Sequence, residues 1–170
     1  MRLVILGAGG YGHTVADLAR QTGRFDEVVF LDDRSTEEGV LGKCEDYGRF
    51  LDGSTVFYPA FGNNELRLGW IRRLKQEGAE ALTLIHATAY VSPEARVEEG
   101  AVILPMSVVN TATRVKEGAI VNCGAIVDHH CVIEAGVHLC PGVIVKAENR
   151  IPSCRKIEAG RVIENREYPV

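Results

Sequence analysis

Residues 91–145 read VSPEARVEEGAVILPMSVVNTATRVKEGAIVNCGAIVDHHCVIEAGVHLCPGVIV, and a branched aliphatic residue returns in this stretch at every sixth position. The column continues beyond the stretch and has thirteen members: Val91, Val97, Ile103, Val109, Val115, Val121, Val127, Ile133, Leu139, Val145, Ile151, Ile157 and Ile163. A helix repeats about every 3.6 residues and a strand every second residue, so neither keeps this period. A fixed period of this kind is typical of a solenoid, in which each coil is stable only when stacked on its neighbours.

Two further columns accompany the aliphatic residues. Four residues after the early anchors lies a small or compact residue, which we also expect to point inward: Ala95, Ala101, Ser107, Thr113, Ala119, Ala125, Cys131, Val137 and Val143. Glycine follows an anchor by three residues, where a tightly turning chain needs a backbone without a Cβ: Gly100, Gly118, Gly124, Gly136, Gly142 and Gly160. Three hexads make one triangular coil, which gives roughly four coils. Near the end Asn149, Arg155 and Arg161 replace the small residues, as in a capping coil.

The first half of the chain has a different periodicity. A strand-like segment at 3–6 (LVIL) runs straight into the glycine turn GAGGYG at 7–12, and a helix is expected at roughly 13–22. A second strand at 28–31 follows. This order is the beginning of a βαβ unit, whose strands are parallel.

A third strand is expected at 55–58, followed by a second helix at 65–77 with Asn63 or Asn64 as its N-cap. The apolar residues of this helix are Leu66, Trp70, Ile71 and Leu74. A last short strand at 82–85 would lead out of the domain.

The two periodicities predict two domains. Residues 1–85 are expected to form a Rossmann-like α/β domain, and residues 86–170 a parallel β-helix of hexapeptide repeats.

Composition disfavours several partner classes. The formal net charge of −4 offers no basic footprint for nucleic acid or anionic lipid. The first apolar run is too short, and too soon broken by glycine, for a signal peptide or a membrane span, so we expect a cytoplasmic protein without membrane insertion. The five cysteines form no CxxC pair and are expected to be reduced thiols.

The whole chain resembles the bacterial sugar acetyltransferases of the hexapeptide-repeat superfamily, which include UDP-4-amino-sugar N-acetyltransferases of the bacillosamine pathway and sialic acid O-acetyltransferases. The motifs that carry the resemblance are GAGGYG at 7–12, FLDD at 30–33, GNNE at 62–65, SPEARVEEGAVI at 92–103 and IVNCGAIVDHHCVIEAGVHLCPG at 120–142. The resemblance implies a homotrimer of left-handed β-helices, acetyl-CoA as donor and a nucleotide-linked amino sugar bound by the N-terminal domain. No metal is implied.

The resemblance also assigns the catalytic residues. The family's catalytic histidine matches His129, but the acidic residue that follows it in the family is replaced here by His130. The task of raising the basicity of His129 therefore passes to Asp128 or is lost. Beside acetyl-CoA we expect His138, which matches a family residue near the thioester, and Asn122, together with Gly142 and Ala159.

Acetyl transfer needs a base beside the attacking group and hydrogen-bond donors for the developing oxyanion. Histidine, with an ordinary pKa of about 6.5, suits the first task, and a neighbouring carboxylate would stabilise the imidazolium. The backbone N–H groups of glycine turns, around Gly142, are candidates for the second.

The glycine turn of the first domain also fits a dinucleotide fingerprint, with Asp32 about twenty residues on. The domain is small for an NAD enzyme, so we prefer a nucleotide-sugar site. We expect Gly9, Gly10 and Tyr11 to lie near the phosphate groups. Asp32 and Asp33 are expected to contact the uridine or the sugar, and Gly62 to border the same pocket. The family commonly has a histidine at the position of Tyr11, so one polar contact is altered here, and His13 is the candidate to compensate for it.

Sequence leaves several alternatives open. N-acetylation is the leading hypothesis, and O-acetylation of a sialic acid or another sugar is its nearest rival, because both use the same base and donor. A non-catalytic nucleotide-binding trimer and an NAD-dependent oxidoreductase are the other classes. The cysteines and histidines at 123–140 do not predict a zinc site, because a solenoid distributes them over different faces.

Overall fold

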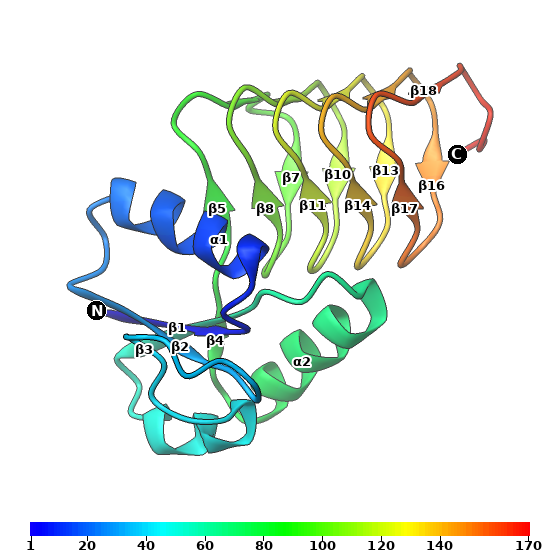
Figure 1. Ribbon diagram of the computed structural model, residues 1–170. Coiled ribbons are helices and arrows are strands. Elements are labelled where there is room, and N and C mark those ends of the chain that lie inside the picture. The colour runs from blue at the N-terminus through cyan, green and yellow to red at the C-terminus, as the bar shows by residue number, and fades with distance from the viewer. The chain divides into compact units, whose positions relative to one another are not determined.

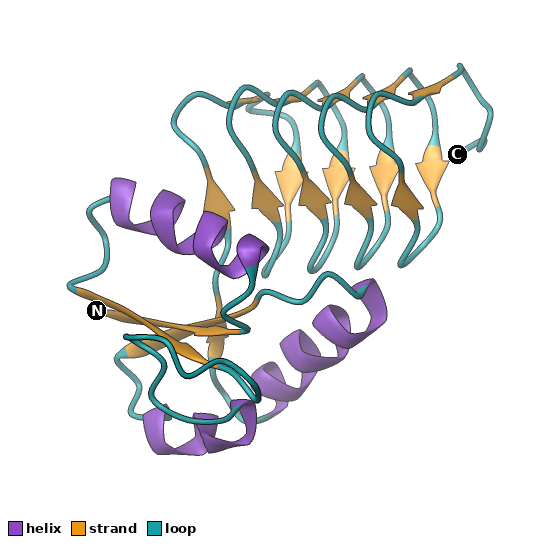
Figure 2. Ribbon diagram, viewed as in Figure 1, coloured by secondary structure: helices purple, strands orange, loops and turns teal.

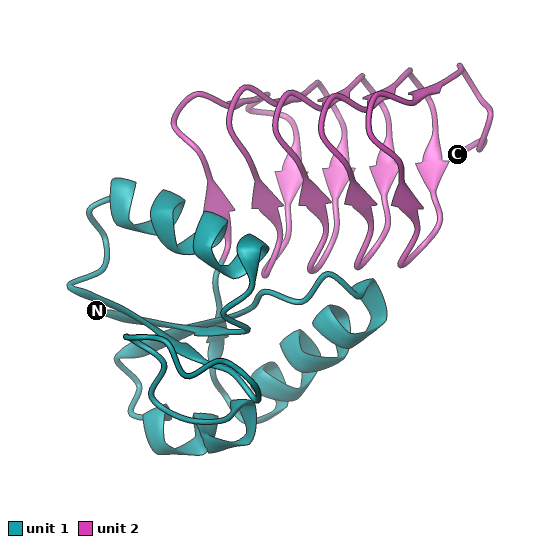
Figure 3. Cartoon of the chain, viewed as in Figure 1, with its two compact units in different colours: residues 1–82 teal, residues 83–170 magenta.

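The computed structural model describes residues 1–170, which form two compact units, Met1–Leu82 and Thr83–Val170 (Figure 3). The division lies between residues 82 and 83, whereas the sequence placed it between 85 and 86. Neither α-helix has the length and apolar character needed to cross a membrane.

The first unit contains a parallel four-stranded sheet with the order β2-β1-β3-β4, as expected for a βαβ beginning (Figure 1). Its strands are β1 (Arg2–Leu6), β2 (Glu27–Leu31), β3 (Thr55–Pro59) and β4 (Glu80–Ala81). Its helices are α1 (Gly10–Gln21), α2 (Asn64–Gln76) and the 3₁₀ helix η1 (Cys44–Phe50).

Two glycines make the turn between β1 and α1 possible. Gly7 has a φ of 104°, in the range that favours glycine, and a Cβ on Gly12 would lie 2.1 Å from the Gly7 carbonyl oxygen. This close approach lets α1 bury Val15, Leu18 and Ala19, which lie on one face of the helix. Both glycines therefore have a structural reason to be there.

Helix α2 begins at the predicted N-cap, since Asn63 Oδ1 accepts a hydrogen bond from the Leu66 N–H at 2.9 Å. Its buried face is rotated from the predicted one: Leu66 is 48% exposed, whereas Arg67 is fully buried. Arg67 is tolerated there because its Nη1 donates to the Phe61 carbonyl oxygen at 3.1 Å. An apolar pattern cannot reveal a charged residue that is buried in this way.

The sequence also missed η1, which contributes Tyr47 and Phe50 to the core of the first unit alongside Phe57 and Leu74. Its two aromatic residues are three apart, the spacing of one 3₁₀ turn.

The second unit is the predicted left-handed parallel β-helix, with three parallel sheets whose strands come from successive coils (Figures 1 and 2). We name each sheet by its first strand. The β5 sheet consists of β5 (Leu84–Ile85), β8 (Val102–Ile103), β11 (Ile120–Val121), β14 (His138–Leu139) and β17 (Lys156–Ile157). The β6 sheet consists of β6 (Tyr90–Val91), β9 (Val108–Val109), β12 (Ile126–Val127), β15 (Ile144–Val145) and β18 (Val162–Ile163). The β7 sheet consists of β7 (Arg96–Val97), β10 (Arg114–Val115), β13 (Val132–Ile133) and β16 (Arg150–Ile151).

In place of the single strand expected at 82–85, the structure has two short strands that belong to different sheets. Glu80–Ala81 pairs with β3, whereas Leu84–Ile85 pairs with β8 and so begins the β5 sheet. Ile85 lies six residues before Val91, so the aliphatic column starts one hexad earlier than the sequence analysis placed it.

The aliphatic column forms the core of the solenoid. Its members from Ile103 to Ile163 are at most 2% exposed, while Val91 and Val97 of the first coil are half-buried. The small column is buried from Ala101 to Asn149.

Asn149 closes the end of this core. Its Nδ2 donates to the carbonyl oxygens of Lys146 and Glu164, both at 2.8 Å, and its Oδ1 accepts from the Tyr168 N–H at 2.7 Å. Beyond it, Arg155 and Arg161 turn outward. The last coil therefore has the polar closure expected of a cap.

Candidate active site

The candidate catalytic residues lie on two edges of the solenoid. The corners that connect the β6 sheet to the β7 sheet form what we call the histidine edge, with residues 110–113, 128–131, 146–149 and 164–167. The corners that connect the β5 sheet to the β6 sheet form the asparagine edge, with residues 104–107, 122–125, 140–143 and 158–161.

His129 and His130 form an exposed imidazole pair on the histidine edge. Their Nδ1 atoms are 3.0 Å apart, and the rings are nearly perpendicular at 87°. One Nδ1 must donate and the other accept. When His129 donates, its Nε2 carries a lone pair toward solvent, as a general base requires.

His130 occupies an unusual backbone position. Its φ is 56°, in the left-handed region where six of the solenoid's turns have glycine. Histidine is among the few other residues that adopt this conformation with some frequency. The His130 N–H donates to the Thr111 carbonyl oxygen at 3.0 Å, which ties the turn to the preceding coil.

Asp128 holds the backbone of this corner. Its Oδ1 accepts from the backbone N–H of His129 at 2.8 Å and from Asn110 Nδ2 at 3.2 Å. Its carbonyl oxygen accepts from the Thr113 hydroxyl at 2.7 Å. The sequence predicts Asp128 as one candidate to polarise His129, and this stays a prediction. Its Oδ1 atom turns back onto the main chain, as is common for a short carboxylate beside its own backbone.

Asn122 lies on the asparagine edge and is brought together with His138, the first residue of β14 in the next coil. Asn122 Oδ1 accepts from the Cys123 N–H at 2.8 Å, so the amide Nδ2 faces His138 Nε2 at 3.0 Å. An amide nitrogen can only donate, and His138 Nε2 is therefore the acceptor. The ring proton of His138 is thus assigned to Nδ1.

Gly142 and Ala159 lie on the asparagine edge, one coil apart. That backbone N–H groups around Gly142 donate to the oxyanion stays a prediction, although the N–H of Gly142 itself is engaged. Its N–H already donates to the Cys123 carbonyl oxygen at 3.0 Å, because its left-handed turn stacks on the preceding coil. Ala159 is exposed, at the position where the preceding coil has Pro141 and no N–H to offer. It remains a candidate for binding acetyl-CoA.

A basic groove of about 570 Å³ runs beside the histidine edge. It is lined by His130 and Glu148, and by three arginines: Arg114, Arg150 and Arg166. Guanidinium groups bind phosphate and carboxylate well, so the groove suits an anionic ligand. The sequence analysis did not single out these arginines, although Arg96, Arg114 and Arg150 recur in multiples of the 18-residue coil.

In the first unit, the residues assigned to phosphate lie at the carboxyl end of β1. Gly9 is the N-cap of α1 without a side-chain cap, and Cβ atoms on Gly9 or Gly10 would meet nothing within 4 Å. An uncapped helix N-terminus with open space before it favours a phosphate group. Gly62 is likewise exposed beside open space.

Tyr11 lies beside the glycine turn and is paired with a buried tyrosine. Its hydroxyl is 2.7 Å from that of Tyr58, which is fully buried. Loss of solvent around the hydroxyl, and then the proximity of Tyr58, raise the pKa of Tyr11 well above its ordinary value. Tyr11 is therefore a neutral hydrogen-bonding group. His13 does not take its place, because His13 Nε2 is 2.8 Å from Glu37 Oε1.

Asp32, for which a contact with the uridine or sugar stays a prediction, accepts hydrogen bonds from three backbone N–H groups. Its Oδ2 accepts from the Ala8 N–H at 2.8 Å, and its Oδ1 from the N–H groups of Arg34 and Ser35 at 2.7 and 2.8 Å. These bonds, led by that of Ala8, hold the pKa of Asp32 below its ordinary value. Both oxygens are engaged because the strand ends where backbone N–H groups need acceptors.

Asp33 is exposed, and its Oδ1 accepts from the Cys44 N–H at 3.0 Å. It therefore remains able to offer its second oxygen to a ligand.

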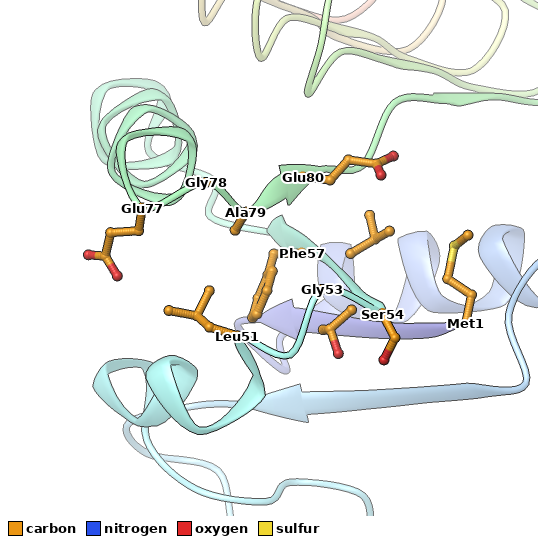
Figure 4. Close-up of a pocket in the computed structure, with 11 residues that line it drawn as sticks. Met1, Leu51, Gly53, Ser54, Phe57, Glu77, Gly78, Ala79 and Glu80 are labelled. Atoms are coloured by element: carbon orange, nitrogen blue, oxygen red, sulfur yellow. The ribbon is translucent and has the colours of Figure 1, made fainter.

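A pocket of about 520 Å³ lies at the opposite end of the same sheet (Figure 4). Its lining includes Met1, Gly53 and Thr55, at the amino ends of β1 and β3. Open parallel sheets bind ligands at the carboxyl ends of their strands, so this pocket is not the candidate nucleotide site.

The thiols of Cys131 and Cys140 are packing groups, because burial raises the pKa of each. No three His, Cys, Asp or Glu side chains converge in a way that could hold a metal ion.

Known proteins share both the first unit and the whole fold. The family model described as the PglD N-terminal domain matches residues 2–74. UDP-N-acetylbacillosamine N-acetyltransferase of Bacillus subtilis (strain 168) is 33% identical over 109 residues, which cover 60% of this chain and half the length of that relative.

Solved structures cover nearly the whole chain. The acetyltransferase domain of PglB from Neisseria gonorrhoeae FA1090, in complex with acetyl coenzyme A, has a TM-score of 0.90 at 35% identity, covering 95% of this chain and 80% of that one. PerB from Caulobacter crescentus, in complex with CoA and GDP-perosamine, has a TM-score of 0.79 at 25% identity, covering 97% and 89%.

A β-helix with an exposed imidazole on its edge, joined to an α/β unit with an open glycine turn, defines an acyltransferase of the hexapeptide-repeat class. The similarity to known sugar acetyltransferases identifies the family within this class. The chain belongs to the family of bacterial sugar N-acetyltransferases.

Proposed function

We propose that the protein transfers the acetyl group of acetyl-CoA to the amino group of a nucleotide-linked amino sugar, of the UDP-4-amino-sugar type, with His129 as the base. The exposed imidazole pair of His129 and His130 is the observation that carries this proposal. We further propose that the reaction takes place in the cytoplasm.

The reaction follows from these groups. His129 Nε2 accepts a proton from the sugar amine, and the amine nitrogen attacks the thioester carbonyl carbon. The C–N bond forms as the C–S bond breaks, and the proton on His129 passes to the departing CoA sulfur. The products are the N-acetyl sugar and CoA. The negative charge that develops on the carbonyl oxygen needs donors, for which the exposed backbone around Ala159 is the candidate.

We infer that the site lies between two copies of the chain. Strand β12 lies between the corner that carries Asn122 and the corner that carries His129, so the two edges are on opposite sides of the β6 sheet. The outward residues of that sheet are all apolar: Tyr90, Val108, Ile126, Ile144 and Val162. An apolar face of this kind favours burial against another subunit. A homotrimer would cover it in every chain and bring the histidine edge of one copy to the asparagine edge of the next.

The acceptor is proposed to bind the first unit through its nucleotide. The open N-terminus of α1 at Gly9 and Gly10 suits a diphosphate, and the free oxygen of Asp33 suits a hydroxyl or base N–H. PerB was solved with a GDP-sugar, so the choice between UDP and GDP is part of the test.

O-acetylation is less well supported. A hydroxyl is a weaker nucleophile than a free amine and depends more on its base. Here the imidazole of His130 occupies the place expected of a carboxylate beside His129. The amine is therefore the better acceptor for this site.

The full-length protein should be incubated with acetyl-CoA and UDP- or GDP-linked amino sugars, with their hydroxy-sugar counterparts, and the products identified by mass spectrometry. We expect N-acetylation of an amino sugar, and a loss of at least about 100-fold in kcat for His129→Ala. Lys75→Ala, an exposed change on α2, is the control.

Wild-type turnover in His129→Ala would remove His129 from the mechanism. Transfer only to hydroxyl groups would favour the O-acetyltransferase. Binding of a nucleotide sugar without any acetyl transfer would favour a non-catalytic trimer. Binding of NADH and of none of the other ligands would favour an oxidoreductase.

A further inference from the structure

The histidine edge lacks glycine at its tight turns. Ala112, His130, Glu148 and Arg166 occupy successive coils, and their φ angles are 56°, 56°, 59° and 57°. Side chains rarely adopt this conformation, and strained backbone of this kind is concentrated at functional sites. The side chains along this edge are therefore worth examining as one set.

Glu148 is stacked directly on the imidazole pair. Its backbone N–H donates to the His129 carbonyl oxygen at 3.2 Å, which places it one coil beyond His129 and His130. Its carboxylate forms an ion pair with Arg166 Nε, from the coil after that. His130, Glu148 and Arg166 all line the basic groove. The edge therefore presents two imidazoles, a carboxylate and a guanidinium in that order.

We propose that Glu148 is the positioning residue that serves His129: its carboxylate, held by Arg166 one coil beyond the imidazole pair, stabilises the positive charge that the pair acquires when His129 takes the substrate proton. This proposal rests on the role of His129 in the proposed function. Neither the resemblance nor the comparisons assign a role to Glu148.

The proton balance is simple. His129 Nε2 gains the proton of the amine, while the proton between the two Nδ1 atoms allows the positive charge to be shared with His130. A neutral imidazole stabilises such a charge less than a carboxylate does. Glu148 supplies the missing negative charge without a direct bond to the base.

Other charged groups also lie near the pair, and Asp128 is a second carboxylate among them. The Oδ1 atom of Asp128 is engaged by the His129 N–H and by Asn110. Arg114 and Arg150 line the same groove and oppose an imidazolium, although Arg150 is paired with Glu134 at 2.7 Å.

Glu148 is also in the right charge state. Arg166 above all, and then the two histidines, lower the pKa of Glu148 below its ordinary value. The carboxylate is therefore ionised throughout the pH range in which an imidazole titrates.

The test compares Glu148→Gln with Glu164→Gln, a matched control on the same edge whose carboxylate is paired with Lys146 instead. The first readout is the NMR titration of the His129 and His130 rings in the full-length protein. We expect the midpoints to move to lower pH by about half a unit in Glu148→Gln and to stay in place in Glu164→Gln. Arg166→Gln, which removes the opposing charge, should move them to higher pH. All shifts should shrink in about 1 M salt, because the groups are partly exposed.

The second readout is acetyl transfer. In Glu148→Gln the acid limb of the kcat profile should move to lower pH, with kcat reduced about 3- to 10-fold and KM for both substrates unchanged. Glu148→Asp should restore part of both effects. Unmoved ring titrations in Glu148→Gln, or equal effects in Glu164→Gln, would overturn the proposal. A shift of the rings in a protein that transfers no acetyl group would instead refute the proposed function and leave the electrostatic role of Glu148 intact.

Discussion

The amide Nδ2 of Asn122, on the asparagine edge, lies 3.0 Å from Nε2 of His138, which begins β14 in the next coil. The amide is held in this orientation by the Cys123 N–H, which donates to its Oδ1. The pair is therefore built to fix one tautomer of His138, in which Nδ1 carries the proton.

Asn122→Ala should weaken the use of acetyl-CoA. Without the amide, His138 Nε2 loses the donor that selects its tautomer, so we expect kcat/KM for acetyl-CoA to fall about 10-fold. KM for the nucleotide sugar should change little, because that substrate is assigned to the first unit. Steady-state kinetics with each substrate varied in turn will check this. An effect confined to the nucleotide sugar would contradict the assignment.

Gly12→Ala should destabilise the first unit. The new Cβ would lie 2.1 Å from the Gly7 carbonyl oxygen, so α1 must move, and we expect a loss of about 3 kcal/mol or more. Gly69→Ala is the contrasting variant: Gly69 is exposed within α2, its Cβ would meet nothing within 4 Å, and we expect a gain of about 0.5–1 kcal/mol. Urea unfolding followed by the fluorescence of Trp70, the one tryptophan, reports on this unit. Equal stability of the two variants would contradict the packing described for the turn.

Asp32→Asn should lower stability in a manner that depends on pH. The folded pKa of Asp32 is depressed, so its contribution is present above the unfolded value of about 3.9 and is lost as pH falls through the folded value. We expect the variant to be about 2 kcal/mol less stable at pH 7, with a smaller difference near pH 3.5. Urea unfolding at both pH values measures this. A difference that stays constant would show that the charge of Asp32 is not involved.

The solenoid was predictable because its period is local: an inward aliphatic at every sixth position marks each strand, from Ile103 to Ile163, with no need to know the pairing. The start of the solenoid at Leu84 was missed because a two-residue strand resembles the end of the preceding domain. The buried face of α2 was misplaced because Arg67 is hidden by a hydrogen bond to a carbonyl, which hydrophobicity cannot indicate.

Within the site, sequence could select residue types but not their hydrogen bonds. The resemblance to the sugar acetyltransferases pointed to His129, Asn122 and His138. Hydrogen bonds to backbone groups engage Asp128, Gly142 and Asp32, and sequence alone does not show such bonds. Glu148 lies eighteen residues after His130, which is one coil of three hexads. The repeat in the sequence therefore already predicts that Glu148 stacks one coil beyond His130.

Mixing two impaired variants should restore activity if the site is shared between copies. His129→Ala lacks the base but keeps its asparagine edge, whereas Asn122→Ala keeps the base. In a trimer assembled from equal amounts of both, about a quarter of the interfaces pair an intact histidine edge with an intact asparagine edge. We therefore expect mixed trimers, refolded together and assayed at low acetyl-CoA, to recover up to about a quarter of the wild-type kcat/KM for acetyl-CoA. This exceeds the value of about a tenth expected for Asn122→Ala alone and the far lower value of His129→Ala. Ile126→Glu, which places a charge on the apolar β6 sheet, should abolish both assembly and this recovery. Mixed trimers that are no more active than the separate variants would place the base and the acetyl-CoA residues within a single chain.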